Sequence, residues 1–382
     1  MKIREVTILG STGSIGINAL KVIENLEEEI RVIGLSCNKN IDLLISQIKT
    51  FSPRYVSIAD EEAYYTFKNK ITNYNFELLK GRNGLLEISS ISDNDLIING
   101  LVGSSGMEPT LRAIKKGINV ALANKESLVM AGSLIKKAMK KSGAKIFPVD
   151  SEHSAIWQCL SGEVLSDVKK LILTGSGGPF RKRALDTFAN ISVPEALAHP
   201  NWEMGRKISI DSATMMNKGF ELIEAFWLFK LDVKKIDIII HPQSIIHSMV
   251  EFIDSSIKAQ IGVPDMKVPI QYALTYPRHV RAPWESLNFS KVNKLTFEEP
   301  DYKRFPCLLL AKKSLKQLGS SPTALNLSND YAVERFLKGE IPFNKIHKIN
   351  KESMDRHIWL KEPNLNDIKE LDIWIKNYVY SF

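Results

Sequence analysis

Acidic residues in two distant parts of the chain have the types and spacing of a metal site. Asp150 and Glu152 follow the apolar run 145–149. In extended geometry, residues two apart project to the same side, so these two carboxylates can converge on one cation. Solvated acids are also common at strand ends, and a third acid is needed to favour a metal. A helix expected near 212–229 supplies Glu221 on the side away from its apolar stripe.

The ligand types indicate which ion and which substrate to expect. Carboxylate oxygens select hard cations, so we expect Mg²⁺ or Mn²⁺ and not zinc. The same helix carries Asn217 and Lys218, and the preceding segment 205–212 adds basic and hydroxyl groups, among them Lys207 and Ser212. Such groups can bind a phosphate, although polar residues beside an apolar stripe are usually only solvated. The pattern favours metal-assisted chemistry on a phosphorylated substrate.

Three further segments are candidates for the same site. In the loop 174–179, backbone amides and the Ser176 hydroxyl offer an anion nest, and a flexible turn is the equal alternative. The loop 198–205 has glycine and proline around Trp202, as a loop that closes over a ligand would, with an ordinary surface loop as the competitor. Asn124-Lys125-Glu126 ends a predicted strand, where open α/β sheets bind ligands.

A glycine-rich motif near the N-terminus indicates a dinucleotide site. Gly10-Ser11-Thr12-Gly13-Ser14-Ile15-Gly16 follows a predicted strand and opens a helix. Its glycines allow a tight turn and close approach of a pyrophosphate, whose charge is met by N–H groups at the helix start. A glycine turn in another α/β protein is the alternative. At the end of the second strand the chain has Asn38-Lys39-Asn40 in place of an acid, which favours a 2'-phosphate and hence NADPH over NADH.

The elements that would position these residues divide the chain into parts. Residues 1–150 alternate apolar strands with amphipathic helices, which predicts a doubly wound parallel sheet and a Rossmann-like NADPH-binding domain. An α+β catalytic and metal-binding domain is expected over 151–275, then a linker over 276–300 and a helical domain over 301–382. The expected strands are Glu5–Leu9, Arg31–Ser36, Tyr55–Ala59, Leu96–Leu101, Asn119–Ala123, Lys145–Val149, and the paired strands Ile236–Ile240 and Ile245–Phe252.

Composition excludes several classes of protein. With 382 residues the chain exceeds one ordinary domain, and its net charge of +8 comes from lysines interleaved with acids, so a field that attracts phosphates is favoured over a nucleic-acid partner. No apolar run reaches membrane-spanning length, and charges within Met1–Val6 exclude a signal peptide, so no membrane partner is expected. Three cysteines without metal spacing favour a reducing cytoplasm.

Over essentially its whole length the sequence resembles the 1-deoxy-D-xylulose 5-phosphate reductoisomerases of non-mevalonate isoprenoid biosynthesis. The segment Asn326-Leu327-Ser328-Asn329-Asp330 departs from the small-residue version usual in that family. The most specific matches are Gly10 to Gly16, Ala123 to Ser127, Pro148 to His153, Thr174 to Phe180, His199-Pro200-Asn201-Trp202 and Met204 to Glu221.

The resemblance implies a role for each candidate residue. Asp150, Glu152 and Glu221 would ligate the metal, and Lys125, Glu152 and His199 would be the catalytic residues. Ser151, with Lys125 and His199, would contact the reacting part of the sugar under Trp202. The substrate phosphate would be held by Ser176, Ser212, Asn217 and Lys218. The cofactor would contact Gly10, Ser11, Thr12, Gly13, Ser14, Ile15, Asn38, Lys39, Asn40, Asn124, Glu126 and Gly205.

The same resemblance implies a reaction and an assembly. The family rearranges a ketose phosphate to a branched aldehyde and reduces it with NADPH to 2-C-methyl-D-erythritol 4-phosphate, as a homodimer. The nearest rival is an NADP-dependent semialdehyde dehydrogenase, which would need a nucleophilic cysteine such as Cys159. A basic module that binds nucleic acid is a distant third.

Overall fold

The computed structural model describes residues 4–26, 30–71, 74–199, 202 and 204–382. The chain forms two compact units, each built from segments that are discontinuous in sequence. The first unit comprises Met1–Ser127, Leu134–Ser154 and Asp265–Trp284, and the second comprises Leu128–Ser133, Ala155–Pro264 and Glu285–Phe382. The domain limits expected from the sequence, 1–150, 151–275, 276–300 and 301–382, stay a prediction.

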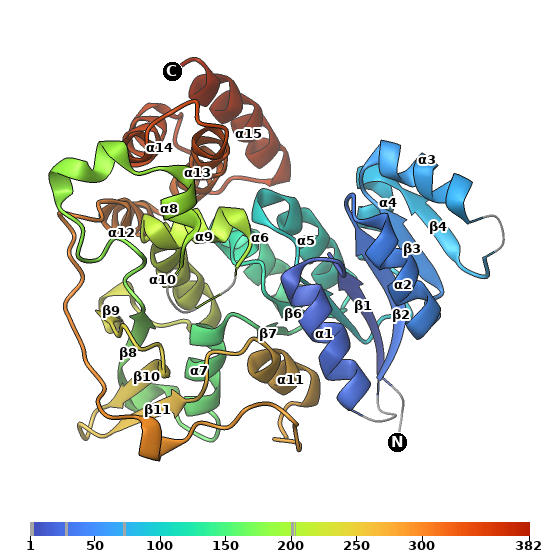
Figure 1. Ribbon diagram of the computed structural model, residues 1–382, viewed down its shortest axis with the longest axis horizontal. Helices are drawn as coiled ribbons and strands as arrows, with labels where there is room; N and C mark the ends of the chain where they lie inside the picture. The colour runs from blue at the N-terminus through green and yellow to red at the C-terminus, as the bar shows by residue number, and fades with distance from the viewer. Residues whose placement is uncertain (1–3, 27–29, 72–73, 200–201, 203) are drawn as a thin grey trace. The chain divides into compact units, whose positions relative to one another are not determined.

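The first unit is organised by a seven-stranded parallel sheet with the order β4-β3-β2-β1-β5-β6-β7 (Figure 1). The order reverses beside β1, so the segments that follow β1 and β5 leave the sheet next to each other, and the amide of Gly100 donates to the carbonyl of Leu9 at 3.0 Å. Ligands of open α/β sheets bind at such a switch point. The strands are β1 (Arg4–Leu9), β2 (Ile30–Cys37), β3 (Tyr55–Ile58), β4 (Glu77–Lys80), β5 (Leu96–Asn99), β6 (Asn119–Leu122) and β7 (Ile146–Pro148).

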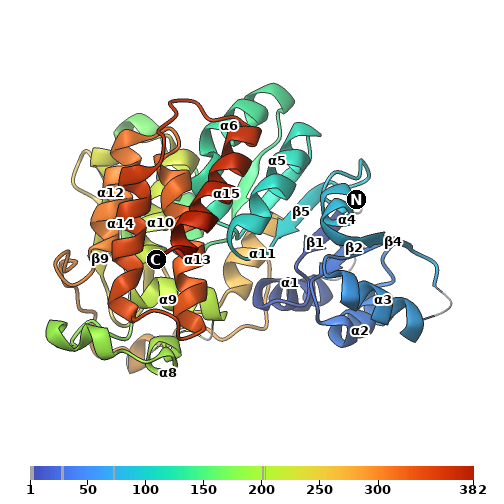
Figure 2. The same cartoon turned by 90° about the horizontal axis from the view of Figure 1, so that it is seen from above.

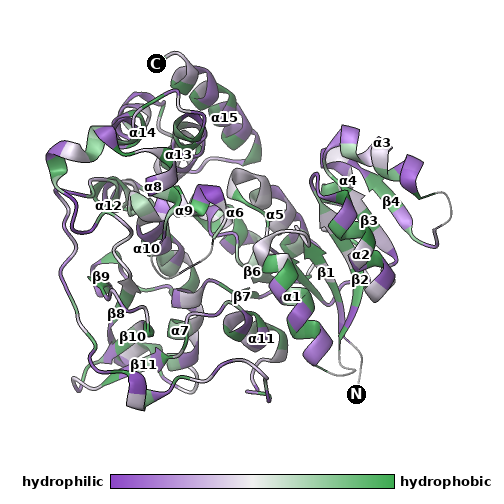
Figure 3. Ribbon diagram, in the orientation of Figure 1, coloured by the Kyte–Doolittle hydropathy of each residue, from purple (hydrophilic) through white to green (hydrophobic). Residues whose placement is uncertain are grey.

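Apolar strands and amphipathic helices explain this sheet. Ile8 of β1 and Ile98 of β5 are fully buried, as both faces of a covered parallel sheet require. In α1, residues Ala19, Val22 and Ile23 form the buried stripe. Figure 3 shows hydrophobic and hydrophilic residues alternating along α1. The helices are α1 (Ser14–Asn25), α2 (Ile41–Phe51), α3 (Glu61–Lys70), α4 (Gly81–Ile88), α5 (Met107–Lys115), α6 (Glu126–Ser142), α7 (Ser151–Cys159) and α11 (Lys267–Thr275), with the 3-10 turn η1 (Gly103–Gly106). Parts of α6 and α7 belong to the second unit.

All six strands expected in the N-terminal part are confirmed, to within two residues at each end. The doubly wound parallel sheet is therefore confirmed. The sequence did not predict β4, because its four residues, Glu77 to Lys80, place two charged side chains around two leucines and form an edge of the sheet.

The second unit contains a mixed sheet with the order β11-β10-β8-β9. The strands 236–240 and 246–252 exist as expected, but the expectation that they pair with each other is wrong, because β8 lies between them. β8 is apolar enough to be a central strand, with Val168, Leu171 and Leu173 fully buried. The strands are β8 (Val168–Gly175), β9 (Ile236–Ile240), β10 (Ile246–Phe252) and β11 (Ile257–Ile261).

Helices make up most of the rest of the second unit, as expected for 301–382. α12, α13, α14 and α15 pack against one another, and α10 packs against α9 and α12 (Figure 2). The helix expected from 212 to 229 is interrupted, because Met215 adopts a left-handed conformation (φ 60°), so Ser212 belongs to α9. The helices are α8 (Val193–Leu197), α9 (Arg206–Ala213), α10 (Met216–Phe229), α12 (Cys307–Gln317), α13 (Ser321–Leu337), α14 (Ile346–Arg356) and α15 (Leu365–Tyr380).

Short 3-10 turns join several of these elements. Within the residues that the structure describes, no helix combines the length and the apolar composition needed to cross a bilayer. The turns are η2 (Leu165–Asp167), η3 (Leu185–Asn190), η4 (Val233–Lys235), η5 (Phe289–Lys291) and η6 (Phe343–Lys345).

The pairing of β1 with β2 yields a test of the first unit. Gly34 of β2 lies opposite Thr7 of β1, and a Cβ at Gly34 would overlap the Thr7 side chain. Gly34→Ala should therefore lower the free energy of unfolding by about 1–3 kcal/mol, measured by urea denaturation followed by circular dichroism. In a Thr7→Ala background the same substitution should cost clearly less, because the overlapping atoms are gone. An equal cost in both backgrounds would contradict this packing.

Candidate active site

The loop after β1 has the geometry of a phosphate-binding turn. Gly10 has a φ of 77°, which favours glycine, and a Cβ at Gly16 would overlap the backbone of Gly10 and Ser11. α1 begins after Gly13 without a side-chain cap, so N–H groups of its first turn stay available to an anion. The structure thus places Gly10 to Ile15 at the switch point of the sheet, as the motif predicts.

Two residues that the sequence did not single out hold this loop in place. The Ser36 hydroxyl of β2 accepts a hydrogen bond from the Gly10 amide at 2.9 Å. The Ser11 hydroxyl donates to Gln47 of α2 at 2.7 Å, and the Gln47 amide donates back to the Ser11 carbonyl at 2.9 Å. These contacts join residues about 26 and 36 positions apart, and no local sequence pattern reveals them. Because all three bonds are buried or partly buried, they hold the loop in place before any ligand binds.

The segment at the end of β2 is exposed and basic. Asn38, Lys39 and Asn40 are exposed, and the Asn40 side chain caps α2 by accepting from the Leu43 amide at 3.2 Å. The Lys39 ammonium lies 3.5 Å from the Asp60 carboxylate, while its side chain remains 74% exposed. An exposed ion pair contributes little stability, so Lys39 can exchange this partner for a bound phosphate at small cost.

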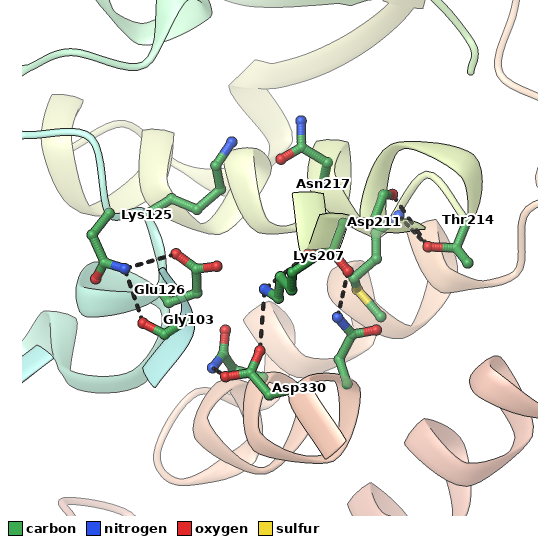
Figure 4. A network of polar contacts seen from close by, with 12 residues as sticks. Gly103, Lys125, Glu126, Lys207, Asp211, Thr214, Asn217 and Asp330 are labelled. Carbon is green, nitrogen blue, oxygen red and sulfur yellow. Dashed lines mark hydrogen bonds and ion pairs between the residues drawn. The ribbon is translucent and has the colours of Figure 1, made fainter. Parts of the chain in front are cut away.

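Asn124 organises the carboxyl ends of β5 and β6. Its side-chain amide donates to the Leu101 and Gly103 carbonyls at 3.0 and 2.9 Å and to Glu126 at 3.1 Å. Gly103 and Glu126 are labelled in Figure 4. Its carbonyl oxygen accepts from the Ser127 amide at 3.1 Å. Through these bonds the Asn124 side chain fixes the turn at Gly103 and the direction of Glu126.

Two of the predicted metal ligands lie together in the first unit. Asp150 is 8% exposed, and its carboxylate forms an ion pair with Lys125, which precedes α6. The Ser151 hydroxyl donates to the Glu152 carboxylate at 2.6 Å. The extended geometry expected for residues 150–152 is wrong, because β7 ends at Pro148 and α7 begins at Ser151. Asp150 instead sits at the start of a helix, where the partial positive charge stabilises an acid.

The charge on Asp150 depends on these neighbours. Burial acts to raise the pKa of Asp150, but the Lys125 ammonium, and after it His153, act in the opposite direction. The pKa of the carboxyl is held well below its usual range. Asp150 is therefore ionised at neutral pH, which is the state that a cation requires.

The third predicted ligand lies among the predicted phosphate-binding residues of the second unit. Glu221 of α10 is fully buried, accepts from the Asn217 amide at 2.6 Å and forms an ion pair with Lys218. A Cβ at Gly175 would lie 2.9 Å from the Lys218 side chain, and a Cβ at Gly178 would lie 2.7 Å from the Ser212 carbonyl. The glycine loop after β8 therefore packs directly against the α9–α10 turn, and this brings the candidate phosphate ligands into one region.

Ser176 and His199 contact each other beside that loop. The Trp202 amide donates to Nδ1 of His199 at 3.0 Å, so this nitrogen is an acceptor and the proton is on Nε2. Nε2 lies 3.1 Å from the Ser176 hydroxyl, which also accepts from the Gly178 amide at 3.2 Å. With both acceptor positions used, the Ser176 O–H can donate to an anion.

The loop that carries His199 is described only in part. Pro200, Asn201 and Glu203 lie outside the described residues. The Trp202 ring is half-buried and lies 6.4 Å from the His247 ring, centroid to centroid. Gly205 is exposed and precedes α9.

Lys207 is not available to a phosphate as the sequence suggested. Its ammonium lies 2.8 Å from Asp211 and 3.1 Å from Asp330, and its side chain is 14% exposed (Figure 4). The sequence could not reveal this, because Asp330 is more than a hundred residues away. Of the basic groups before α10, Arg206 is exposed, whereas Lys207 forms ion pairs with Asp211 and Asp330.

Comparison with known proteins supplies the family. A family model described as 1-deoxy-D-xylulose 5-phosphate reductoisomerase matches residues 6–132, a model of its C-terminal domain matches 146–229, and a model described as DXP reductoisomerase C-terminal domain matches 261–378. The 1-deoxy-D-xylulose 5-phosphate reductoisomerase of Chloroherpeton thalassium is 49% identical over 377 residues, covering 99% of this chain and 97% of the relative. That of Geobacillus sp. is 46% identical, covering 98% and 99%.

Solved structures agree with the sequence relatives. The reductoisomerase from Zymomonas mobilis in complex with NADPH is 42% identical, with a TM-score of 0.92 over 100% of this chain and 99% of that one. A DOX-P reductoisomerase in complex with NADPH, fosmidomycin and magnesium is 38% identical, with a TM-score of 0.94 over 99% and 98%. The chain therefore belongs to the 1-deoxy-D-xylulose 5-phosphate reductoisomerase family.

Proposed function

We propose that this chain converts 1-deoxy-D-xylulose 5-phosphate to 2-C-methyl-D-erythritol 4-phosphate, with NADPH as reductant and Mg²⁺ or Mn²⁺ as the metal. The observation that carries the proposal is the arrangement on α10, where Asn217 and Lys218, suited to a phosphate, directly contact Glu221, suited to a cation. A substrate that has both a phosphate and metal-binding oxygens matches this pair of functions.

The residues of the first unit fit NADPH. The pyrophosphate would bind over Gly10 to Ile15, because Gly10 permits the turn and the uncapped start of α1 supplies N–H donors. Asn38, Lys39 and Asn40 would surround the 2'-phosphate. Asn124 and Glu126 would line the cofactor site where the strand order reverses. Gly205, from the second unit, would contact the cofactor through its backbone. When bound, NADPH supplies the hydride that reduces the aldehyde.

The proposed metal ligands are Asp150, Glu152 and Glu221. All three offer oxygen, and Asp150 is held ionised, so the donor set fits a hard divalent cation. When bound, such a cation acts as a Lewis acid on the carbonyl and hydroxyl oxygens of the substrate. Because Asp150 and Glu221 are paired with Lys125 and Lys218, these lysines compensate the carboxylate charges when the ion is absent.

The other candidate residues would bind and orient the sugar phosphate. Ser176 and Ser212, with Asn217 and Lys218, would hold the phosphate away from the reacting bonds, and this remote binding energy would lower the barrier. Lys125 and Glu152 would move or stabilise a proton at the substrate oxygens, next to Ser151. His199 would turn its Nε2–H from the Ser176 hydroxyl to the reacting part of the sugar. Trp202 would exclude water.

We propose a homodimer that works in the cytoplasm. The strand β11 is an edge of its sheet and exposes Ile257 (54%) and Ile261 (38%). An exposed apolar edge strand is a template for pairing with another chain, and a second copy is the partner that fits the family. The three cysteines are free and buried, which is compatible with a reducing compartment.

The rival dehydrogenase requires a nucleophilic cysteine, and Cys159 is unsuited to that role. Burial raises the pKa of the Cys159 thiol to about 11, so the thiolate is scarce at neutral pH. Family membership over almost the whole chain also argues against this rival.

The direct test mixes purified protein with 1-deoxy-D-xylulose 5-phosphate, NADPH and Mg²⁺ and follows the loss of NADPH absorbance. We expect turnover that stops on addition of a chelator and returns when excess Mg²⁺ or Mn²⁺ is added. Turnover that persists in the chelator would contradict a metal-dependent reaction, and absence of turnover with the metal present would contradict the proposed substrate.

The role of Lys39 is tested by charge reversal. Lys39→Glu should reduce the preference for NADPH over NADH by at least about tenfold, because a carboxylate would repel the 2'-phosphate. The preference is measured as the ratio of dissociation constants from cofactor fluorescence. Lys70→Glu is the matched control, since Lys70 is also exposed and pairs with Asp42 on α2. An unchanged ratio in the Lys39 variant would remove Lys39 from the cofactor site.

The role of Glu221 is tested by removing its charge. Glu221→Gln should lower metal-dependent turnover by more than about a hundredfold, because a neutral amide is a poor ligand for Mg²⁺, while NADPH binding is retained. Glu251→Gln is the control, since Glu251 pairs with Lys169 on the surface of β8 and β10. Near-normal turnover in the Glu221 variant would rule out its role as a ligand.

A further inference from the structure

A buried charged cluster joins α9 to the C-terminal helices. Asp211 is 2% exposed and lies one helical turn after Lys207, whose ammonium contacts it at 2.8 Å (Figure 4). The ammonium also lies 3.1 Å from Asp330 of α13 and 5.3 Å from the centre of the Phe220 ring of α10. The aromatic face adds a further favourable contact for the cation. Lys207 therefore connects three helices at one point.

Neutral amides extend the cluster from α9 into α13 and α14. The second oxygen of Asp211 accepts a hydrogen bond from Asn329 at 2.6 Å. Asn329 is fully buried, and its carbonyl oxygen accepts from Asn350 of α14 at 3.0 Å. These bonds cross between segments that are 118 and 21 residues apart. They fix the position of α9 against α13 and α14.

The same residue borders the proposed phosphate site. The Asp211 carbonyl accepts from the Thr214 hydroxyl at 3.2 Å, and this bond shapes the turn that leads from α9 to α10. Ser212 begins that turn, and its carbonyl accepts from the Met215 amide at 3.0 Å. A Cβ at Gly178 would overlap the Ser212 carbonyl, so the glycine loop packs closely against the end of α9. A shift of α9 would therefore displace Ser212 relative to Ser176.

Charge compensation is essential at this place. An uncompensated carboxylate beside Ser212 would repel a substrate phosphate, and its burial would be costly without a cation. The charge of Asp211 also affects Cys307. Burial is the larger cause and the Asp211 carboxylate the next, and together they raise the pKa of the Cys307 thiol to about 12. Lys207 supplies the compensating charge.

We propose that Asp211, held by Lys207 and Asn329, is a positioning residue that sets the place of Ser212 in the substrate-phosphate site. The helices α13 and α14 thereby take part in substrate recognition without touching the substrate. The inference rests on the proposed function, because it assumes that Ser212 binds the substrate phosphate.

Asp211→Asn is the central variant, because it keeps the shape of the side chain and removes its charge. We expect the KM for 1-deoxy-D-xylulose 5-phosphate and the inhibition constant of inorganic phosphate to rise together by about tenfold, since a small displacement of Ser212 weakens every contact to the phosphate. The dissociation constant of NADPH, read by fluorescence, should stay within about twofold of the unaltered enzyme, because all proposed cofactor residues except Gly205 lie in the first unit and are not altered.

A second pair of variants separates charge from shape. Lys207→Met should raise the same two constants further, because it leaves Asp211 buried without its cation. Adding Asp211→Asn to Lys207→Met should restore part of the phosphate affinity, as expected when one substitution removes the penalty caused by the other. The control is Asp372→Asn, which removes a carboxylate of α15 that accepts a hydrogen bond at 2.7 Å from Tyr331 of the same helix α13.

The outcomes are distinct. If Asp211→Asn lowers the urea midpoint while KM and phosphate inhibition match those of Asp372→Asn, the cluster is only structural and the positioning role is wrong. If adding Asp211→Asn to Lys207→Met restores none of the phosphate affinity, the role assigned to charge compensation is wrong. If inorganic phosphate does not compete with substrate in the unaltered enzyme, the proposed phosphate site itself fails, and the inference fails with it.

Discussion

Asp150, Asp211 and Glu221 are carboxylates almost out of reach of solvent, and each has a lysine ammonium beside it, Lys125, Lys207 and Lys218 respectively. Removing a carboxylate from water costs on the order of several kcal/mol, unless a cation and hydrogen bonds replace the lost solvation. The rest of the site is arranged around this requirement. Glycines at 175 and 178 leave the space that the Lys218 side chain and the Ser212 carbonyl occupy.

The three lysine–carboxylate pairs differ in whether the lysine can leave its carboxylate. Lys207 lies between two acids and an aromatic ring, so it is held in a structural cluster. Lys125 and Lys218 are paired with acids that we propose as metal ligands. A divalent cation on those acids would compete with the ammonium groups and make them available to substrate oxygens and phosphate. Lys125 keeps Asp150 ionised, and both lysines hold their carboxylates in place until the metal binds.

Local sequence signals were sufficient for the cofactor half and insufficient for the links between distant segments. The glycine motif and the apolar strands predicted the sheet and the loop at Gly10, because both depend on neighbours in sequence. The partners of Ser11 and of Lys207 were not predictable, since Gln47 and Asp330 come from other elements.

Two errors have the same origin. The apolar strands 236–240 and 246–252 are close in sequence, and two strands with so short a connection usually form a hairpin. The sequence therefore predicted that they pair with each other. The insertion of β8 between them depends on tertiary packing. The helix near 212–229 was read as continuous, because periodicity does not detect a single left-handed residue such as Met215.

We propose that Asp150, Glu152 and Glu221 bind one hard cation, and that Asp150 and Glu221 release their lysines when they do. A crystal structure of the Mn²⁺-loaded protein, with anomalous scattering to locate the ion, would show this. We expect one peak with oxygen atoms of all three acids within about 2.2 Å, and with Lys125 and Lys218 moved off Asp150 and Glu221. An ion bound without Glu221, or lysine pairs unchanged around a bound ion, would contradict it.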